Sequence, residues 1–303
     1  MSHHSASEQL PPRHGGVKPS GAPARSTPVG APSRCDGPSA AGGAASQLLP
    51  QAAGPASAEG SLRSSGESSG LPLAGSNALK LPADAGAELT LSQLRISEIF
   101  YSLQGETSRA GLPTVFVRLT GCPLRCTYCD TAYAFSGGQN MTLAAILTEV
   151  AGHHARYVTV TGGEPLAQKN CLHLLRALCD AGYEVSLETG GALDVSGVDA
   201  RVMKVLDIKT PASGEVEKNL WSNLAALNAR DEIKFVLCDE ADYVWARQVL
   251  RERDLAEKCA VLFSPVPSQL SATTLAEWIL RDKLPVRLQV QLHKLLWGNV
   301  TGH

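Results

Sequence analysis

The sequence predicts an α/β fold for residues 92–303, and more narrowly an incomplete β/α barrel. Three observations indicate it. Short β-branched runs alternate with amphipathic runs, about seven strand candidates outnumber the helix candidates, and chemically suggestive residues follow the strands. Such alternation is typical of a parallel sheet with crossover helices, and active residues gather at the carboxyl ends of its strands. A complete (β/α)₈ ring would need more helices than the sequence offers.

The strands are predicted from short runs rich in β-branched and aliphatic residues. In chain order they are TVFVRL (114–119), YVTVT (157–161), EVSLET (184–189), MKVLDI (203–208), DEIKFVL (231–237), AVLFS (260–264) and VRLQVQL (286–292). Apolar residues at helical spacing predict helices over 141–154, 166–182, 241–253 and 273–283. The interval between 189 and 203 has little room for a helix, which favours the incomplete barrel.

Residues 1–91 differ in composition from the rest of the chain. Of residues 1–90, 56 are Gly, Ala, Pro or Ser, and no Phe, Tyr or Trp precedes Phe100. Such a segment has too little bulky apolar surface to offset the entropy of ordering, so it is predicted to be a disordered extension with an inert thiol, Cys35. It lacks the apolar core of a signal peptide, whereas its Ser/Ala-rich, acid-poor composition leaves an organellar transit peptide as an alternative.

Charge and cysteine usage narrow the class of protein. The formal net charge of −2 gives no electrostatic reason to expect nucleic-acid or membrane binding. No apolar run approaches the roughly 18 residues that a membrane helix needs. The eight cysteines are scattered, unlike a secreted disulfide framework, so a cytoplasmic location is expected. Those predicted to be small buried hydrophobes are Cys171, Cys179, Cys238 and Cys259.

Three further cysteines stand close together in GCPLRCTYCDT (121–131), with the spacing C-x₃-C-x₂-C. They are Cys122, Cys126 and Cys129. Cysteine thiolates hold iron–sulfur clusters, and a [4Fe–4S] cluster with only three of them has one iron open to a chelating small molecule. The alternative is a zinc site completed by His153 or His154, although this spacing is unusual for zinc. A [4Fe–4S] cluster is the favoured interpretation.

The cysteine loop and a motif one strand later resemble the radical S-adenosylmethionine (SAM) superfamily. Tyr128 is the aromatic residue before the third cysteine, and GGEP (162–165) resembles the second motif of the superfamily. GGEP alone would read as a Gly-rich turn with Pro165 opening a helix. The resemblance implies that SAM binds the open iron through its amino and carboxylate groups. It also implies that an electron from the cluster cleaves SAM to methionine and a 5′-deoxyadenosyl radical.

Longer stretches resemble one family in that superfamily, the 7-carboxy-7-deazaguanine synthases. They are SLQGETSRAGLPTVFVRLTGCPLRCTYCDTAYAF (102–135), ETGG (188–191), DIKTP (207–211) and RLQVQLHKLLWGN (287–299). The resemblance implies a lyase of queuosine and deazapurine biosynthesis. It would contract 6-carboxy-5,6,7,8-tetrahydropterin to 7-carboxy-7-deazaguanine with loss of ammonia. Implied with it are SAM, the [4Fe–4S] cluster, Mg²⁺, a homodimer, and an electron donor such as flavodoxin or ferredoxin.

The resemblance also implies roles for individual residues. Those implied to line the SAM site are Tyr128, Cys129, Asp130, Gly163, Asp207, Ile208, Lys209, Ser264 and Val266. Those implied to contact the pterin are Leu103, Gln104, Gly105, Arg118, Thr161, Gln291 and His293. Thr131 is implied to bind Mg²⁺, a hard ion that prefers oxygen ligands and takes several from water or substrate. No side chain is implied as the catalytic group, because SAM and the cluster carry the chemistry.

Several of these residues also have ordinary structural interpretations. Arg118 ends a strand, where it could grip a carboxylate or form a simple ion pair. Thr131 could cap a turn. Gln291 and His293 alternate on the last predicted strand and so face one side, where a histidine is often a satisfied core residue. Thr107 stands where QGEG is the usual form, which leaves the geometry of this turn open.

Two other functions remain compatible with the sequence. A glycyl-radical activase shares the cysteine spacing but acts on a protein, so Gln104, Arg118 and His293 would then be coincidental. A non-catalytic zinc-binding protein would hold zinc in a colourless sample rather than iron and sulfide in a brown one. The last residues, LWGNVTGH (296–303), are predicted to form a polar tail.

Overall fold

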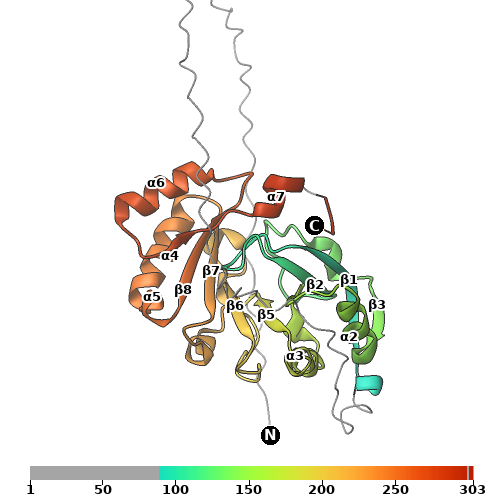
Figure 1. Cartoon of the computed structure of the whole chain (residues 1–303). Helices are drawn as coiled ribbons and strands as arrows, with labels where there is room; N and C mark the ends of the chain where they lie inside the picture. The colour runs from blue at the N-terminus through green and yellow to red at the C-terminus, as the bar shows by residue number, and fades with distance from the viewer. Residues whose placement is uncertain (1–88, 299, 303) are drawn as a thin grey trace, which may run out of the picture. The chain divides into compact units, whose positions relative to one another are not determined.

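The computed structural model describes residues 89–298 and 300–302. The predicted disordered extension, residues 1–91 with Cys35, lies outside the described residues except for its last three positions. None of the described helices is long and apolar enough to cross a membrane. The described residues form a nine-stranded sheet in the order β3-β1-β2-β4-β5-β6-β7-β8-β9 (Figure 1).

The elements have the following bounds. The strands are β1 (Gln93–Leu103), β2 (Pro113–Leu119), β3 (Gln139–Thr142), β4 (Tyr157–Gly162), β5 (Glu184–Thr189), β6 (Met203–Ile208), β7 (Glu232–Leu237), β8 (Ala260–Pro265) and β9 (Arg287–Leu288). The α-helices are α2 (Leu143–Gly152), α3 (Cys171–Asp180), α4 (Glu240–Glu252), α5 (Leu255–Lys258), α6 (Ala272–Asp282) and α7 (Leu292–Trp297). Helix α3 starts later than predicted, because a short 3₁₀ helix, η2 (Pro165–Ala167), takes the first part of that segment.

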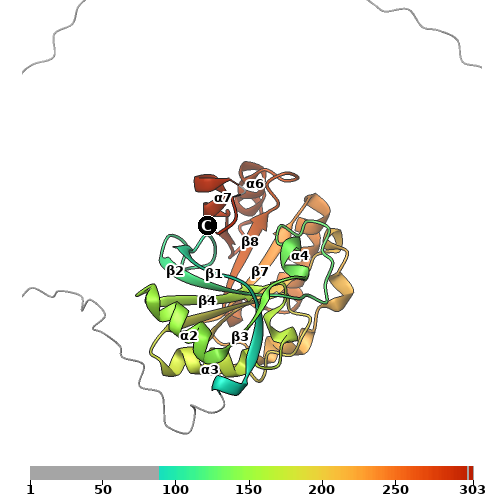
Figure 2. The same ribbon diagram turned by 90° about the vertical axis from the view of Figure 1, so that its right-hand side faces the viewer.

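The parallel sheet is confirmed for β2 and β4 to β9, which pair in parallel along the whole series. The sheet stays open at β3 and β9, and the helices lie around the fan of strands (Figures 1 and 2). In the described chain no α-helix separates β5 from β6. Only the 3₁₀ helices η3 (Pro211–Ser213), η4 (Val216–Lys218) and η5 (Trp221–Ala226) separate β6 from β7. The prediction of an incomplete barrel is therefore confirmed.

Two antiparallel strands, β1 and β3, were missed by the sequence analysis. In β1 only Leu94 and Ile96 are buried, and much of the strand stays partly exposed. A strand near a sheet edge therefore shows neither a long apolar run nor a clean alternation. The short edge strand β3 has no buried residue, so it carried even less signal.

The last predicted strand, 286–292, is largely wrong. Strand β9 covers only Arg287–Leu288, and Gln291 is the N-cap of α7. The Leu292 N–H donates to the Gly105 carbonyl at 2.9 Å, so the chain leaves the sheet and packs on the loop after β1. This tertiary contact overrides the β propensity of VRLQVQL.

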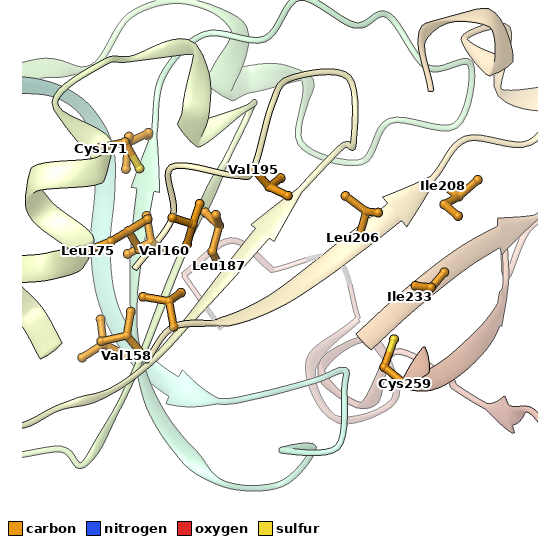
Figure 3. Close-up of a cluster of buried hydrophobic side chains, with 14 of the residues drawn as sticks. Val158, Val160, Cys171, Leu175, Leu187, Val195, Leu206, Ile208, Ile233 and Cys259 are labelled. Carbon is orange, nitrogen blue, oxygen red and sulfur yellow. The ribbon is translucent and has the colours of Figure 1, made fainter. Parts of the chain in front are cut away.

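The central strands use their two faces differently. One set of alternate residues packs into an apolar core against the helices (Figure 3). Members of this core are Val158, Val160, Cys171, Leu175, Leu187, Leu206, Ile233 and Cys259. Cys238 is also buried and Cys179 partly so, in keeping with their predicted place inside the fold. The intervening residues, which include Thr161, Glu188, Asp207 and Lys234, face a cavity.

A buried ion pair offers a test of the sheet's stability. Lys204 Nζ lies 3.0 Å from Asp231 Oδ2, and the two side chains are 4% and 0% exposed. The Asp231 carboxylate also accepts the Lys204 and Asn228 N–H groups, both at 2.8 Å. Breaking a buried pair from one side typically costs about 3–5 kcal/mol, because the other charge is left uncompensated.

We therefore expect Lys204→Met to lower the free energy of unfolding of the metal-free protein by about 3 kcal/mol, measured by urea titration. The matched control is Lys258→Met on the exposed face, expected to stay within about 0.5 kcal/mol of wild type. Equal stability of the two variants would mean that the N–H donors alone satisfy Asp231.

Candidate active site

A cavity of about 540 Å³ opens at the carboxyl ends of the parallel strands. This volume suits a small-molecule site. Every residue named by the sequence analysis as a ligand-contacting residue lines this cavity, except Ile208. The Ile208 side chain is 3% exposed and packs in the core (Figure 3), so only its backbone can border the site.

The three cysteines lie on the loop that follows β2 and line the cavity. All three are free thiols of intermediate exposure. Burial raises the pKa of Cys122 and Cys126, and the charge of Lys209 partly opposes this at both sites. Their thiolates therefore need further positive charge, which metal bound to them would supply.

A zinc ion and a [4Fe–4S] cluster make different demands on the donors. A zinc ion needs its ligands to converge on one point. In the residues that the structure describes, no three His, Cys, Asp or Glu side chains converge closely enough to hold one metal ion. A [4Fe–4S] cluster lacks this requirement, because each thiolate binds a different iron. His153 lies away from the cavity, with its ring stacked 5.9 Å from that of Tyr101. The donor set fits a cluster.

The two glycines of GGEP are required by close packing on the cysteine loop. Gly162 has φ +147°, and a Cβ there would lie 2.3 Å from the Leu119 carbonyl oxygen. A Cβ on Gly163 would lie 2.2 Å from the Gly121 carbonyl oxygen and 2.9 Å from Cys122 Cβ. The backbone beside the cysteines is therefore bare of side chains, which lets a ligand's polar head approach closely.

Glu164 of the same motif joins two loops, a role that the sequence analysis did not identify. Its fully buried carboxylate accepts the Thr189 hydroxyl at 2.9 Å, the Gly190 N–H at 2.7 Å and the Leu166 N–H at 3.0 Å. Burial raises the pKa of Glu164, although these donors oppose the rise. Glu164 thereby fixes the GGEP turn against the segment after β5.

The predicted cofactor side of the cavity contains buried polar atoms that lack protein partners. Lys209 Nζ lies 3.1 Å from Asp207 Oδ2. In the described part of the chain, neither Asp207 Oδ1 nor the Tyr128 hydroxyl has a hydrogen-bond partner. Orphaned buried polar atoms that line a cavity indicate a polar ligand, and the hydroxyl and amine groups of SAM would satisfy them. Ser264 and Val266, on and just after β8, line the same space.

Glu188 organises the predicted substrate side. Its carboxylate accepts Gln104 Nε2 at 3.2 Å and the Thr161 hydroxyl at 2.8 Å. Gln104 Oε1 in turn accepts the Glu106 N–H at 3.1 Å. Burial raises the pKa of Glu188, and the charge of Glu106 adds to the rise. The sequence analysis used Glu188 only as part of ETGG, because its partners come together only in the folded sheet.

Arg118 forms the ion pair that its ordinary structural interpretation predicts. Its Nε–H donates to Glu98 Oε1 at 2.6 Å, and Glu98 also accepts the Tyr133 hydroxyl at 2.8 Å. The guanidinium lies 5.7 Å from the centre of the Phe100 ring and 5.8 Å from that of Tyr133. Within the described residues only its Nε–H donates a hydrogen bond, so the terminal N–H groups remain for a ligand in the cavity.

The Thr131 side chain lies beside the Asp130 carboxylate. Its hydroxyl donates to Asp130 Oδ1 at 2.9 Å, and it makes no capping bond to the 3₁₀ helix η1 (Ala132–Phe135) that follows. Asp130 also accepts Lys294 Nζ at 2.7 Å. Burial opposes ionisation of Asp130, but its hydrogen bonds to Lys294 and Thr131 lower the pKa to about 2. The carboxylate and the hydroxyl together form a hard donor set of the kind that Mg²⁺ prefers.

The C-terminal segment forms one wall of the cavity. Gln291 and His293 are not on a strand, yet both line the cavity from the start of α7. Burial lowers the pKa of His293. Of the predicted polar tail, Gly298 and residues 300–302 also line the cavity, a contact that the sequence analysis did not predict. Their Gly-rich sequence gave no signal of this contact.

Thr107 stands in place of the usual Gly, and its backbone adopts a conformation that favours Gly. It is buried with φ +68°, a left-handed conformation that costs a residue with a Cβ about 1–2 kcal/mol. Its hydroxyl accepts the Arg109 N–H at 3.1 Å, which offsets part of that cost. The turn therefore forms with Thr in this position.

Gly105 permits the close approach of His293. A Cβ on Gly105 would lie 2.0 Å from His293 Nδ1, so Gly105→Ala must displace the imidazole. We expect kcat/KM to fall by about 100-fold, since displacements near 1 Å in a site have effects of this size. The control is Gly152→Ala, where a Cβ meets nothing within 4 Å. Normal turnover by Gly105→Ala would show that the position of His293 is unimportant.

The fold and the site define a class. Three cysteines follow one parallel strand and GGEP ends the next, which is the arrangement of a radical SAM protein, and the model of the radical SAM superfamily matches residues 116–207. A 7-carboxy-7-deazaguanine synthase of Chlorobaculum tepidum is 51% identical over 212 residues, covering 69% of this chain and 96% of that protein. This chain belongs to the 7-carboxy-7-deazaguanine synthase family.

Two further similarities agree with this family assignment. The synthase of Koribacter versatilis is 42% identical over 219 residues, covering 67% of this chain and 97% of that protein. The crystal structure of QueE from Escherichia coli matches with a TM-score of 0.58 at 23% identity, covering 68% of this chain and 98% of that one. The latter likeness concerns the fold alone. Neither the activase nor the zinc-binding alternative is favoured by these comparisons.

Proposed function

We propose that this protein is a radical SAM lyase that converts 6-carboxy-5,6,7,8-tetrahydropterin to 7-carboxy-7-deazaguanine with loss of ammonia, in the biosynthesis of queuosine and related deazapurines. One observation carries the proposal. The cysteine loop, the GGEP turn and a set of buried polar residues line the same cavity, in a chain 51% identical to a synthase of that name.

The proposed cofactors fit the residues present. Cys122, Cys126 and Cys129 would hold a [4Fe–4S] cluster that supplies, with SAM, the reductive formation of a carbon radical. Around SAM, the bare backbone at Gly163 leaves room for its amino group. Asp207 and Tyr128 offer partners for its polar atoms, and Lys209 pairs with Asp207. The residues bind and orient the reactants and exclude water.

The substrate is proposed to lie on the Glu188 side of the cavity. Arg118 would hold the pterin carboxylate through its free terminal N–H groups, because a guanidinium matches a carboxylate with two parallel hydrogen bonds. Gln104, Thr161 and His293 would face the ring. Thr131, with Asp130 beside it, would contribute a protein ligand to Mg²⁺ bound at the substrate.

Some parts of the proposal rest on the family resemblance or on composition. They are a homodimer, a flavodoxin or ferredoxin as electron donor, and a catalytic domain at 92–303 after an N-terminal extension at 1–91. A cytoplasmic location is proposed because the cysteines are scattered along the chain, unlike a secreted disulfide framework.

The decisive experiment is anaerobic reconstitution of the whole chain with iron and sulfide. The protein is then incubated with SAM, dithionite, Mg²⁺ and 6-carboxytetrahydropterin, and 7-carboxy-7-deazaguanine is detected by mass spectrometry. Product formation supports the proposal. Cleavage of SAM to 5′-deoxyadenosine without deazaguanine would leave the superfamily assignment and overturn the substrate. A colourless zinc protein that leaves SAM intact would overturn the activity.

A further inference from the structure

A lysine outside every motif lies at the centre of the cavity's carboxylates. Lys234 Nζ lies 2.8 Å from Glu106 Oε2 and 3.7 Å from Asp207 Oδ2, and its side chain is 13% exposed. Glu106 belongs to the loop after β1, on the predicted substrate side. Asp207 belongs to β6, on the predicted cofactor side. One ammonium group therefore bridges the two halves of the site.

The sheet fixes the position of this lysine. In the parallel register of β6 and β7, Asp207 is the partner of Lys234, so the two side chains lie next to each other on the cavity face. The neighbours of Lys234 on β7, Ile233 and Phe235, are fully buried in the core on the opposite face. Lys234 thus stands on a central strand, whereas its partner Glu106 stands on a loop.

The charges around Lys234 depend on it. Burial opposes its charged form, but Glu106, Asp207 and Glu188 together hold its pKa well above the usual value. Burial likewise opposes ionisation of Glu106, yet Lys234 keeps the pKa of Glu106 below its usual value. Asp207 has a second cation in Lys209 at 3.1 Å. Beside Lys234, the hydrogen-bonding side chain at the Glu106 carboxylate is the neutral amide of Gln291, at 2.8 Å.

We propose that Lys234 is a positioning residue that ties the loop carrying Glu106 to Asp207 and so sets the distance between substrate and SAM. This inference rests on the proposed function. The radical chemistry that SAM would supply has to act on the bound substrate, so the separation of the two ligands would control how much of that chemistry gives product. A misplacement near 1 Å has consequences of about 100-fold in rate.

Removal of Lys234 leaves Glu106, Glu188 and Asp207 as buried acids with one fewer cation among them. Their repulsion moves the Glu106 loop, because Asp207 and Glu188 are on strands and the loop is not. Gln291 then loses a fixed partner at the start of α7. SAM cleavage would continue in such a site, while a smaller share of it would yield product.

The test uses Lys234→Met in the reconstituted full chain. The readouts are iron content, the KM for the pterin, and the ratio of 5′-deoxyadenosine to 7-carboxy-7-deazaguanine. We expect wild-type iron content and SAM cleavage within about threefold, with KM or the ratio raised about tenfold or more. A merely structural lysine would not change that ratio.

Lys204→Met is the matched control. Lys204 is also a buried lysine in a strand of this sheet, and its carboxylate partner, Asp231, lies away from the cavity. This variant is expected to be less stable but to keep the wild-type ratio. Glu106→Gln provides a second route, since it removes the same ion pair without touching β7. It should raise the ratio in the same direction, and it decides the question if Lys234→Met does not fold.

The outcomes separate the two proposals. Product from wild type with an unchanged KM and ratio in Lys234→Met and Glu106→Gln overturns the role of Lys234. No product from wild type overturns the proposed function instead. A raised ratio in all three variants, Lys204→Met included, would assign the effect to general loosening and would also overturn the positioning role.

Discussion

Cys126→Ala is expected to abolish formation of 7-carboxy-7-deazaguanine and of 5′-deoxyadenosine alike. Cys126 supplies one of three thiols that line the cavity, and within the described residues no other cysteine lines it. With two thiolates left, two irons of a [4Fe–4S] cluster instead of one would lack a cysteine ligand, and among the described residues no other cysteine is placed to replace it. The expected loss is about a thousandfold or more, beyond the about 10–100-fold caused by changes to residues that only orient metal ligands. The measurements are iron and sulfide content, absorbance and both products.

Cys179→Ala is the matched control for this variant. Cys179 is likewise a free, partly exposed thiol, on α3 and away from the cavity. The control should keep its iron and its turnover. If Cys126→Ala retained iron and cleaved SAM at the wild-type rate, the assignment of the three cysteines as cluster ligands would be wrong.

Arg118→Lys is expected to raise the KM for the pterin by about 10- to 100-fold with a smaller change in SAM cleavage. Lysine keeps the charge but lacks the planar set of N–H donors. It therefore cannot hydrogen-bond to Glu98 and at the same time bind a carboxylate through two parallel hydrogen bonds. Hydrogen bonds to charged groups contribute about 1.5–3 kcal/mol, which corresponds to this change in affinity. Steady-state kinetics with the pterin varied at saturating SAM measure it.

Arg109→Lys controls for the loss of a guanidinium as such. Arg109 has the same exposed fraction as Arg118, 16%, and the same kinds of neighbour, a glutamate and an aromatic ring. It lies outside the cavity, so its replacement should leave KM unchanged. A KM equal to wild type in Arg118→Lys would remove the carboxylate contact from the proposal.

The sequence was sufficient to predict the central parallel strands and the position of the site at their carboxyl ends. Runs such as YVTVT and MKVLDI are buried on both faces of the sheet, and this produces a strong signal. Strand β1, next to the sheet edge, and the edge strand β3 were missed because much of each strand is partly exposed. The segment 286–292 was misassigned because its β propensity yields to the contact between Leu292 and Gly105.

The sequence likewise revealed some residues of the site and missed others. Those in compact motifs, such as the three cysteines and GGEP, were found because their spacing along the chain is itself the signal. Glu188 and Lys234 were not singled out, because a charged residue inside a strand looks like an ordinary exposed position. Only the register of neighbouring strands reveals that Asp207 and Lys234 stand side by side.

The alternation of core and cavity residues along β4 to β7 has a consequence for how this enzyme can change over evolution. Point substitutions on the cavity face alter chemistry while Leu187, Leu206 and Ile233 hold the fold. A one-residue insertion or deletion inside these strands exchanges the two faces, placing Leu206 in the site and Asp207 in the core. We therefore expect changes in length to be tolerated in the loops rather than inside these strands, and new specificities to arise in the loops or by single replacements.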